Sequence, residues 1–280
     1  MHEVMHNTCA LGGCLCDFTL KSMEKIFSYK KLDCLYQWRS DQFIKTVVTE
    51  ECPYLRNEHM NRVHRFLDNE KGLQILENQK KERVQQFFEN MKQSSIMLFD
   101  NIVDINIVLY TNILNRDDTC FFQIRHKYWK MKGGNTLVPF PIVERLSPHE
   151  IIANMVFIFD YFKSLKNDIS IWYLNYPFST HLAVSNPLDT KKEKMKMELA
   201  HLISDISSIK YIPCFIVESV YAKDKLHFID LFYDILGTYI YLCENDIIKY
   251  QHFPPVMKFQ DFNNYIVKQS SKNNFSDMAF

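Results

Sequence analysis

Short apolar runs alternate along this chain with segments in which apolar side chains recur at helical spacing. The runs that predict strands cover residues 4–11, 32–36, 95–99, 169–174 and 211–217. Between them the repeat changes from the strand pattern to one of three to four residues, which is typical of amphipathic helices. Strands that alternate with helices form βαβ units, so the pattern predicts a largely parallel sheet covered by helices on both faces.

Start and stop residues mark several of the expected helices. Ser147, Pro148 and Glu150 form a helix start, and that helix should run to about Leu165. Asp17 is expected to cap a helix that follows the first strand. Other helical segments are predicted at 58–92 (one helix, or two that break near Gly72), 186–206 and 226–236, with a short extra strand at 238–242.

The fold class that this order favours is α/β, a flavodoxin-like three-layer sandwich. Its mostly parallel sheet should have about five strands, and helical insertions should lie between them. Residues 1–269 are expected to form a single domain, and residues 270–280 a polar C-terminal tail.

Composition excludes several classes of function. Lys and Arg together number 33, as do Asp and Glu, so there is no basic excess of the kind that nucleic-acid binding usually requires. No apolar run reaches the roughly 18 residues needed for a membrane span, and no secretory signal opens the chain. Eight cysteines without such a signal favour reduced thiols and a cytoplasmic protein. Neither a Walker motif nor a dinucleotide fingerprint is present, and no cofactor is expected.

Two of the six glycines, Gly12 and Gly13, stand together where the first strand ends, and Cys14 follows at once. Glycines there predict a sharp strand-to-helix turn with positive φ, because no Cβ opposes it. A nucleophile on such a turn would stand clear of the sheet among free backbone N–H groups. The alternative is a tight turn with a packed cysteine.

Polar residues follow the other strands as well. Ligands bind at the carboxyl ends of parallel strands, so we expect these polar residues to lie together at that edge of the sheet. The residues gathered by this rule are Cys14, Asp100, Asn101, Asn175 and Glu218.

Several short motifs together resemble a known family. Residues 11–16 (Leu-Gly-Gly-Cys-Leu-Cys) resemble the opening motif of GSCFA-like domains, in the SGNH hydrolase-like superfamily. The other matching segments are Asn186 with Lys191 or Lys192 and Leu199, Tyr211-Ile-Pro213 with Glu218, and Asp246 to His252 with Phe253-Pro254. Gly13 replaces the family's Ser, and Lys249 stands where the family has an Asp three residues before its His.

The resemblance implies acyl chemistry on an acylated small molecule or carbohydrate. Cys14 would be the nucleophile, His252 the general base and Asp246 its orienting carboxylate. Gly13, Asn101 and Asn175 are then expected around the oxyanion and the substrate. An alternative base is His227, which has the Asp-x-x-His spacing with Asp224.

Other hypotheses stay open on the sequence alone. Cys9, Cys14 and Cys16 with His2 and His6 could hold a metal ion, although their spacing matches no standard zinc pattern, so no metal is expected. A papain-like hydrolase would also use Cys14, but with its base on an antiparallel sheet. A non-catalytic binding or assembly module would explain the altered motifs.

Two further segments have ordinary structural explanations beside functional ones. The charged run 191–196 is expected to be a solvated helix face rather than a phosphate or nucleic-acid site. His181, after the fourth strand, could contact a ligand or be an ordinary loop residue.

Overall fold

A computed structural model describes residues 6–68, 70–115, 118–124, 128–132, 135–136, 138–178, 187–223 and 227–272. At its centre lies a parallel sheet in the order β11-β10-β4-β1-β2, with the short β3 also paired to β1. Its strands are β1 (His6–Gly12), β2 (Tyr29–Lys31), β3 (Leu35–Tyr36), β4 (Ile96–Asp100), β10 (Ser170–Leu174) and β11 (Lys210–Ile212). This is the flavodoxin-like order 2-1-3-4-5, so the predicted fold class is confirmed.

Successive side chains of the strands enter two separate cores. Ala10, Leu98 and Trp172 face one core, which α1 (Cys14–Ile26), α9 (Asp230–Glu244) and α10 (Phe259–Lys272) cover. Their neighbours Leu11 and Phe99 face the other core, beneath α5 (Lys81–Gln93) and α7 (Pro148–Leu165). Burial on both faces explains why the strands are continuous apolar runs rather than alternating ones.

The helix at 148–165 forms as predicted. Ser147 Oγ accepts the Glu150 N–H, and the Glu150 carboxylate accepts the Ser147 N–H, so the expected capping box is present. The helix α8 (Pro187–Ser204) also lies close to its predicted range.

Other predicted helices differ from the structure. The helix α1 begins at Cys14, so Asp17 is not its cap; it lies in the first turn and pairs with Lys21 and Lys31. Gly237 does not end α9, which continues to Glu244 and replaces the strand predicted at 238–242. At this position Gly237 meets Met23 of α1, where a Cβ would lie 2.9 Å from the Met23 side chain. The absence of a side chain therefore serves helix packing.

The fifth predicted strand is divided at Pro213. Proline lacks the N–H that a sheet ladder needs, and the chain leaves the central sheet there. The second half, β12 (Cys214–Ile216), pairs in parallel with β13 (Val256–Lys258) in a separate two-stranded sheet.

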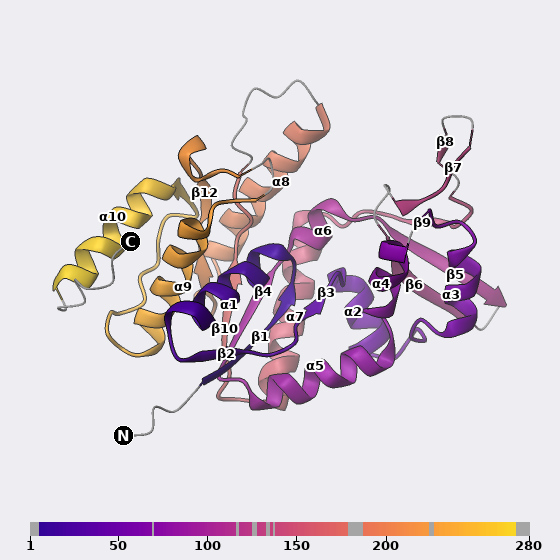
Figure 1. Ribbon diagram of the computed structural model, residues 1–280, viewed down its shortest axis with the longest axis horizontal. Helices are drawn as coiled ribbons and strands as arrows, with labels where there is room; N and C mark the ends of the chain where they lie inside the picture. The colour runs from indigo at the N-terminus through magenta and orange to yellow at the C-terminus, as the bar shows by residue number, and fades with distance from the viewer. Residues whose placement is uncertain are drawn as a thin grey trace.

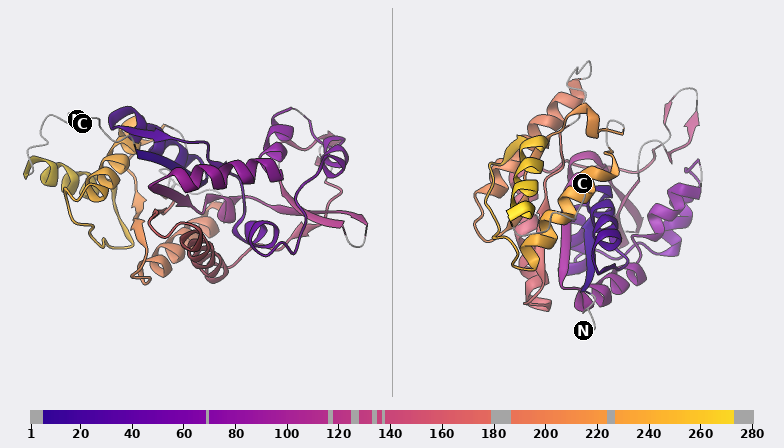
Figure 2. Two further views of the ribbon diagram at one scale, coloured as in Figure 1. Left: turned by 90° about the horizontal axis from the view of Figure 1, so that it is seen from below. Right: turned by 60° about the vertical axis from the view of Figure 1, so that its left-hand side comes forward.

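Two stretches of the chain, one before α5 and one before α7, form an insertion that extends from the main body, on the right of Figure 1 and in the left view of Figure 2. The predicted helix at 58–92 is three helices, α3 (Asn57–His64), α4 (Glu70–Glu77) and α5, and Gly72 lies within α4. The remaining elements of the insertion are β5 (Leu109–Asn115), β6 (Asp118–Gln123), β7 (Met131–Lys132), β8 (Asn135–Thr136) and β9 (Ile142–Val143). The strands β6-β5-β9 form an antiparallel sheet over an aromatic core.

The described residues also include short helical segments: α2 (Ser40–Phe43), a π-helical turn (Ile44–Val48), α6 (Ile102–Asn106) and a 3-10 turn (Ser219–Tyr221). Within the described residues, none of the helices has the length and apolar character of a membrane span.

Candidate functional site at the carboxyl edge of the sheet

Three neighbouring strands deliver polar residues to one edge of the central sheet. The strands β1, β4 and β10 are parallel and in register, with Leu11 beside Phe99 and Asp100 beside Leu174. The residues that follow them therefore meet at the carboxyl edge. Cys14, Asn101 and Asn175 come together there as the rule predicts. Glu218 follows β12, outside the central sheet.

The Asp100 carboxylate holds the turn that precedes Cys14. Its Oδ2 accepts the N–H groups of Gly13 at 2.9 Å and Cys16 at 3.2 Å, and its Oδ1 accepts the Ile102 N–H at 3.2 Å. Burial raises the pKa of Asp100, while these hydrogen bonds oppose the shift. The Asp100 side chain thus accepts hydrogen bonds at the N-terminus of α1, where negative charge is favoured.

Gly13 is required for space and not for a left-handed conformation. Its φ is −119°, so the predicted positive φ is wrong. A Cβ at Gly13 would lie 2.3 Å from Cγ2 of Ile102, and one at Gly12 would lie 2.9 Å from Cγ of Asp100. The two glycines allow β4 and its following turn to pack directly against the backbone before Cys14.

Cys14 is the first residue of α1 and is half-buried. Its Sγ lies 3.9 Å from Oη of Tyr176, within reach of a hydrogen bond to sulfur. Burial, and then the nearby Cys14, raises the pKa of Tyr176 far above its usual range, so the phenol keeps its proton and can donate it. Cys52 is also half-buried, and the remaining six cysteines are buried.

The two asparagines have different surroundings. Asn175 Nδ2 donates to the carbonyl of Ile212 at 2.8 Å, which ties the end of β10 to β11. Asn101 is buried, and its Oδ1 has no hydrogen-bond partner among the described residues. Because Asp100 accepts the Gly13 N–H, that amide is engaged within the protein and is not free to bind an oxyanion.

His252 lies at the far edge of the sheet from Cys14. Its Nδ1 is 3.4 Å from Oη of Tyr211 on β11, and its ring contacts the rings of Tyr211 and Tyr250. Three strand spacings of about 4.8 Å put β11 about 14 Å from β1. The structure therefore does not bring His252 to Cys14.

Asp246 lies at the opposite end of the sheet from Cys14. It is exposed, with a left-handed φ of 55°, in the turn that ends α9. Two residues before it, Glu244 bonds Ser170 and Lys210, the first residues of β10 and β11. Asp246 is thus a helix-terminating residue at the amino end, too far away to orient an imidazole beside Cys14.

The alternative base His227 lies on the same side as Cys14. Its ring meets the ring of Phe18 edge-on, with centroids 6.2 Å apart. Phe18 is four residues beyond Cys14 in α1, and residues with this spacing lie on one face of a helix. Asp224, Asn186 and His181 lie outside the described residues.

Sequence reasoning missed two residues at this edge. Tyr176 directly follows Asn175, so its place after β10 was a usable signal. Lys196 lies in the run predicted to be a solvated face, yet only 6% of it is exposed. It shares the spacing of Leu199, Ala200 and Ile203, which are buried on one face of α8, and that repeat was the available signal.

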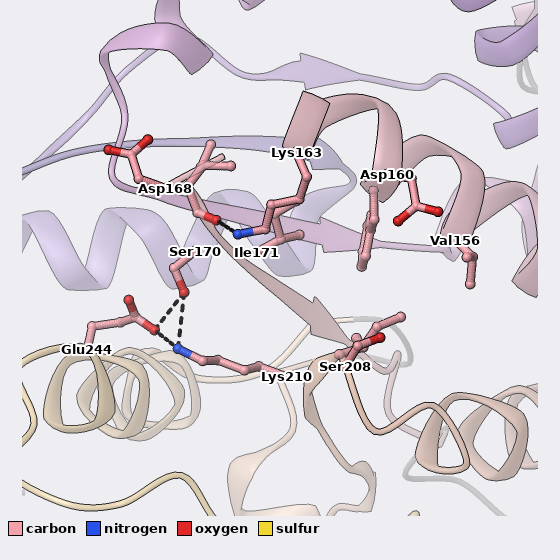
Figure 3. Close-up of a pocket in the computed structure, with 12 residues that line it drawn as sticks. Val156, Asp160, Lys163, Asp168, Ser170, Ile171, Ser208, Lys210 and Glu244 are labelled. Atoms are coloured by element: carbon pink, nitrogen blue, oxygen red, sulfur yellow. Dashed lines mark hydrogen bonds and ion pairs between the residues drawn. The ribbon is translucent and has the colours of Figure 1, made fainter. Parts of the chain in front are cut away.

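A cavity of about 440 Å³ opens at the opposite, amino end of β10 and β11 (Figure 3). Two of its charged groups bind each other: Lys210 Nζ donates to Glu244 at 2.7 Å, and Ser170 Oγ donates to the same carboxylate oxygen at 2.8 Å. Trp172 Nε1 donates to that oxygen as well, at 2.8 Å. No predicted site residue lines this cavity.

Two of the rival hypotheses can be compared with the geometry. A helix does begin at Cys14, as a papain-like hydrolase requires, but the sheet beside it is parallel and not antiparallel. Within the described part of the chain, no cluster of three His, Cys, Asp or Glu side chains has the arrangement of a metal site.

Comparison with known proteins gives little further information. No family model matches the chain, and no curated protein matches it. Among solved structures it is similar to an acetyl xylan esterase from the rumen bacterium Butyrivibrio proteoclasticus, with a TM-score of 0.36 and 7% identity. The match covers 88% of this chain and 65% of that one. A similarity of this degree assigns neither a family nor an activity.

Proposed function

We propose that this protein is an acyl-ester hydrolase or acyltransferase whose nucleophile is Cys14. The observation that carries the proposal is the half-buried Cys14 thiol at the carboxyl edge of a parallel sheet, 3.9 Å from the Tyr176 phenol. Ligands of open α/β sheets bind at this edge. The thiol also begins a helix, where the positive end of the helix dipole favours a thiolate.

The reaction would proceed through a thioester. The Cys14 sulfur attacks the acyl carbonyl, the ester C–O bond breaks, and the alcohol leaves with a proton from an imidazolium. Water or an acceptor hydroxyl then attacks the thioester, gives its proton to the imidazole and releases Cys14. The phenol of Tyr176 is placed to donate to the sulfur or to the nearby oxyanion.

We assign the base to His227 in preference to His252. His227 contacts Phe18, on the helix that Cys14 begins, whereas His252 lies against Tyr211 at the far edge. The substrate class, an acylated carbohydrate or small molecule, comes from the resemblance of the short motifs to SGNH-like domains.

The test is hydrolysis of 4-nitrophenyl acetate by purified variants, with the thioester identified on the Cys14 peptide by mass spectrometry. Cys14→Ala and His227→Ala should lower kcat by about 1,000-fold, the scale of losing a nucleophile or base. Cys52→Ala is the matched control, because Cys52 is also half-buried. It and His252→Ala should keep most of the activity. Hydrolysis that survives in Cys14→Ala would exclude the mechanism.

One observation supports the alternative of a non-catalytic binding module. The Asp100 carboxylate already binds the Gly13 and Cys16 amides at the head of α1, where an esterase would stabilise a developing negative charge. A protein that binds acylated sugars without thioester formation or hydrolysis, and whose binding is lost in Tyr176→Ala, would match this alternative.

A further inference from the structure

Lys196 is a buried cation at the carboxyl edge, beside the residues that contact Cys14. Its Nζ donates to the carbonyl of Pro177 at 2.9 Å and to Glu193 at 3.0 Å. Burial of an ammonium group is costly unless the group is paired and hydrogen-bonded, and these two acceptors meet that need. The contact with Pro177 fixes the segment that leaves β10.

The same ammonium lies against the ring that approaches Cys14. Lys196 Nζ is 5.2 Å from the centroid of the Tyr176 ring, within the range of a cation–π contact. Tyr176 Oη in turn lies 3.9 Å from Cys14 Sγ. A positive charge against the ring draws electron density from the phenol, which strengthens it as a hydrogen-bond donor. These two contacts therefore connect Lys196 to the Cys14 thiol through the Tyr176 side chain.

The amino end of the sheet holds a matching lysine, at the opposite end from Cys14. Lys210 Nζ lies 2.7 Å from Glu244 and 5.4 Å from the centroid of the Trp172 ring. Figure 3 shows Lys210 and Glu244 together at the edge of the cavity. Both lysines have an acidic partner and an aromatic ring, so Lys210, although more exposed, controls for the loss of a cation with these contacts.

We infer that Lys196 is a positioning residue for Cys14: it holds the Tyr176 ring and strengthens the phenol as a hydrogen-bond donor to the sulfur. This inference rests on the proposed function, because it assigns Lys196 a role in preparing that nucleophile. It gives Lys196 no contact with the substrate.

The experiment measures the rate at which iodoacetamide alkylates Cys14 between pH 5 and 9. The rate is followed on the Cys14 peptide by mass spectrometry, in the full chain carrying Cys52→Ser. Lys196→Met should slow alkylation at pH 7 about tenfold, which corresponds to a shift of about one pH unit in the midpoint. Lys210→Met should leave the profile unchanged. Glu193→Gln removes the counter-charge and should shift the midpoint downward.

The path through Tyr176 is tested by a double variant. In Tyr176→Phe the phenol is absent, so adding Lys196→Met should slow alkylation no further. An unchanged profile in Lys196→Met, or two losses that multiply in the double variant, would overturn the inference. If Lys196→Met fails to fold, unchanged midpoints in both Glu193→Gln and Tyr176→Phe overturn it.

The two measurements separate this inference from the proposed function. Alkylation needs no acyl substrate, so a shifted profile in a protein that hydrolyses no ester supports the role of Lys196 and contradicts the proposed activity. Hydrolysis through Cys14 with no dependence on Lys196 supports the proposed activity and overturns the role of Lys196.

Discussion

The two ends of the central sheet differ in the partners of the carboxylates that lie there. At the amino end, one oxygen of Glu244 receives hydrogen bonds from Ser170, Trp172 and Lys210. At the carboxyl end, Asp100 and Asp104 are buried carboxylates, and no lysine or arginine of the described residues forms an ion pair with either. Asn101 Oδ1 and Tyr173 Oη near them have no described hydrogen-bond partner.

This difference distinguishes the Glu244 cluster from the candidate site at the carboxyl end. The cavity of about 440 Å³ lies at the amino end, where Glu244 is engaged by Ser170, Trp172 and Lys210. The carboxyl end has the half-buried thiol and the polar atoms without described partners. Buried polar groups that lack partners cost stability, and such costs are concentrated at functional sites.

The largest expected effect concerns the pH dependence set by Asp104. Burial raises its pKa to about 7, from 3.8. Between these values the folded protein binds more protons than the unfolded chain, so stability falls as pH rises from about 4 to about 7. A pKa difference of this size corresponds to about 4 kcal/mol. Urea titrations should show this loss in the wild-type protein and a flatter dependence in Asp104→Asn; equal slopes would contradict the assignment.

Removal of each carboxylate compares the two ends directly. Asp100→Ala leaves one buried and two part-buried N–H groups without their acceptor and should lower the free energy of unfolding by about 3 kcal/mol. Glu244→Ala should cost about 1–2 kcal/mol, because the cavity and solvent can rehydrate its partners. Urea midpoints give both values, and a larger loss for Glu244→Ala would reverse the comparison.

Gly13→Ala tests the close packing at the carboxyl end. The added methyl group would meet Cγ2 of Ile102, at a cost of about 2 kcal/mol. Ile102→Ala removes Cγ2 of Ile102, the atom that the new methyl group would meet. The double variant should therefore lose less free energy of unfolding than the sum of the two single losses. If urea unfolding shows that the two losses in free energy are strictly additive, the protein accommodates the methyl group at a place other than Ile102.

The smallest effect is expected for His252→Ala. The imidazole loses its contacts with Tyr211 and Tyr250, worth about 0.5–1 kcal/mol. Alkylation of Cys14 should proceed at the wild-type rate, because His252 lies three strands away. A clear fall in the alkylation rate would show that His252 acts on Cys14, as the sequence motif predicted.

The pattern of apolar residues was sufficient for the central architecture. Strands at 96–100 and 170–174 and the capped helix after Ser147 form close to their predicted ranges, because each depends on local repeats and capping groups. Helical insertions were predicted, but the antiparallel sheet within this one was not; its strand β9 pairs with β5 from more than 30 residues away, Ile142 opposite Tyr110. Pairing of that kind leaves no short-range repeat.

At the candidate site, the sequence by itself determined which residues follow the strands, because the end of an apolar run can be found locally. It thereby placed Cys14, Asn101 and Asn175 at one edge. Only the tertiary structure decided their partners: Asp100 binds the Gly13 amide, Tyr176 meets Cys14, and His252 and Asp246 lie elsewhere. The physical reason is that strand order and the paths of loops between strands depend on packing across the whole sheet, and a short motif does not encode those distances.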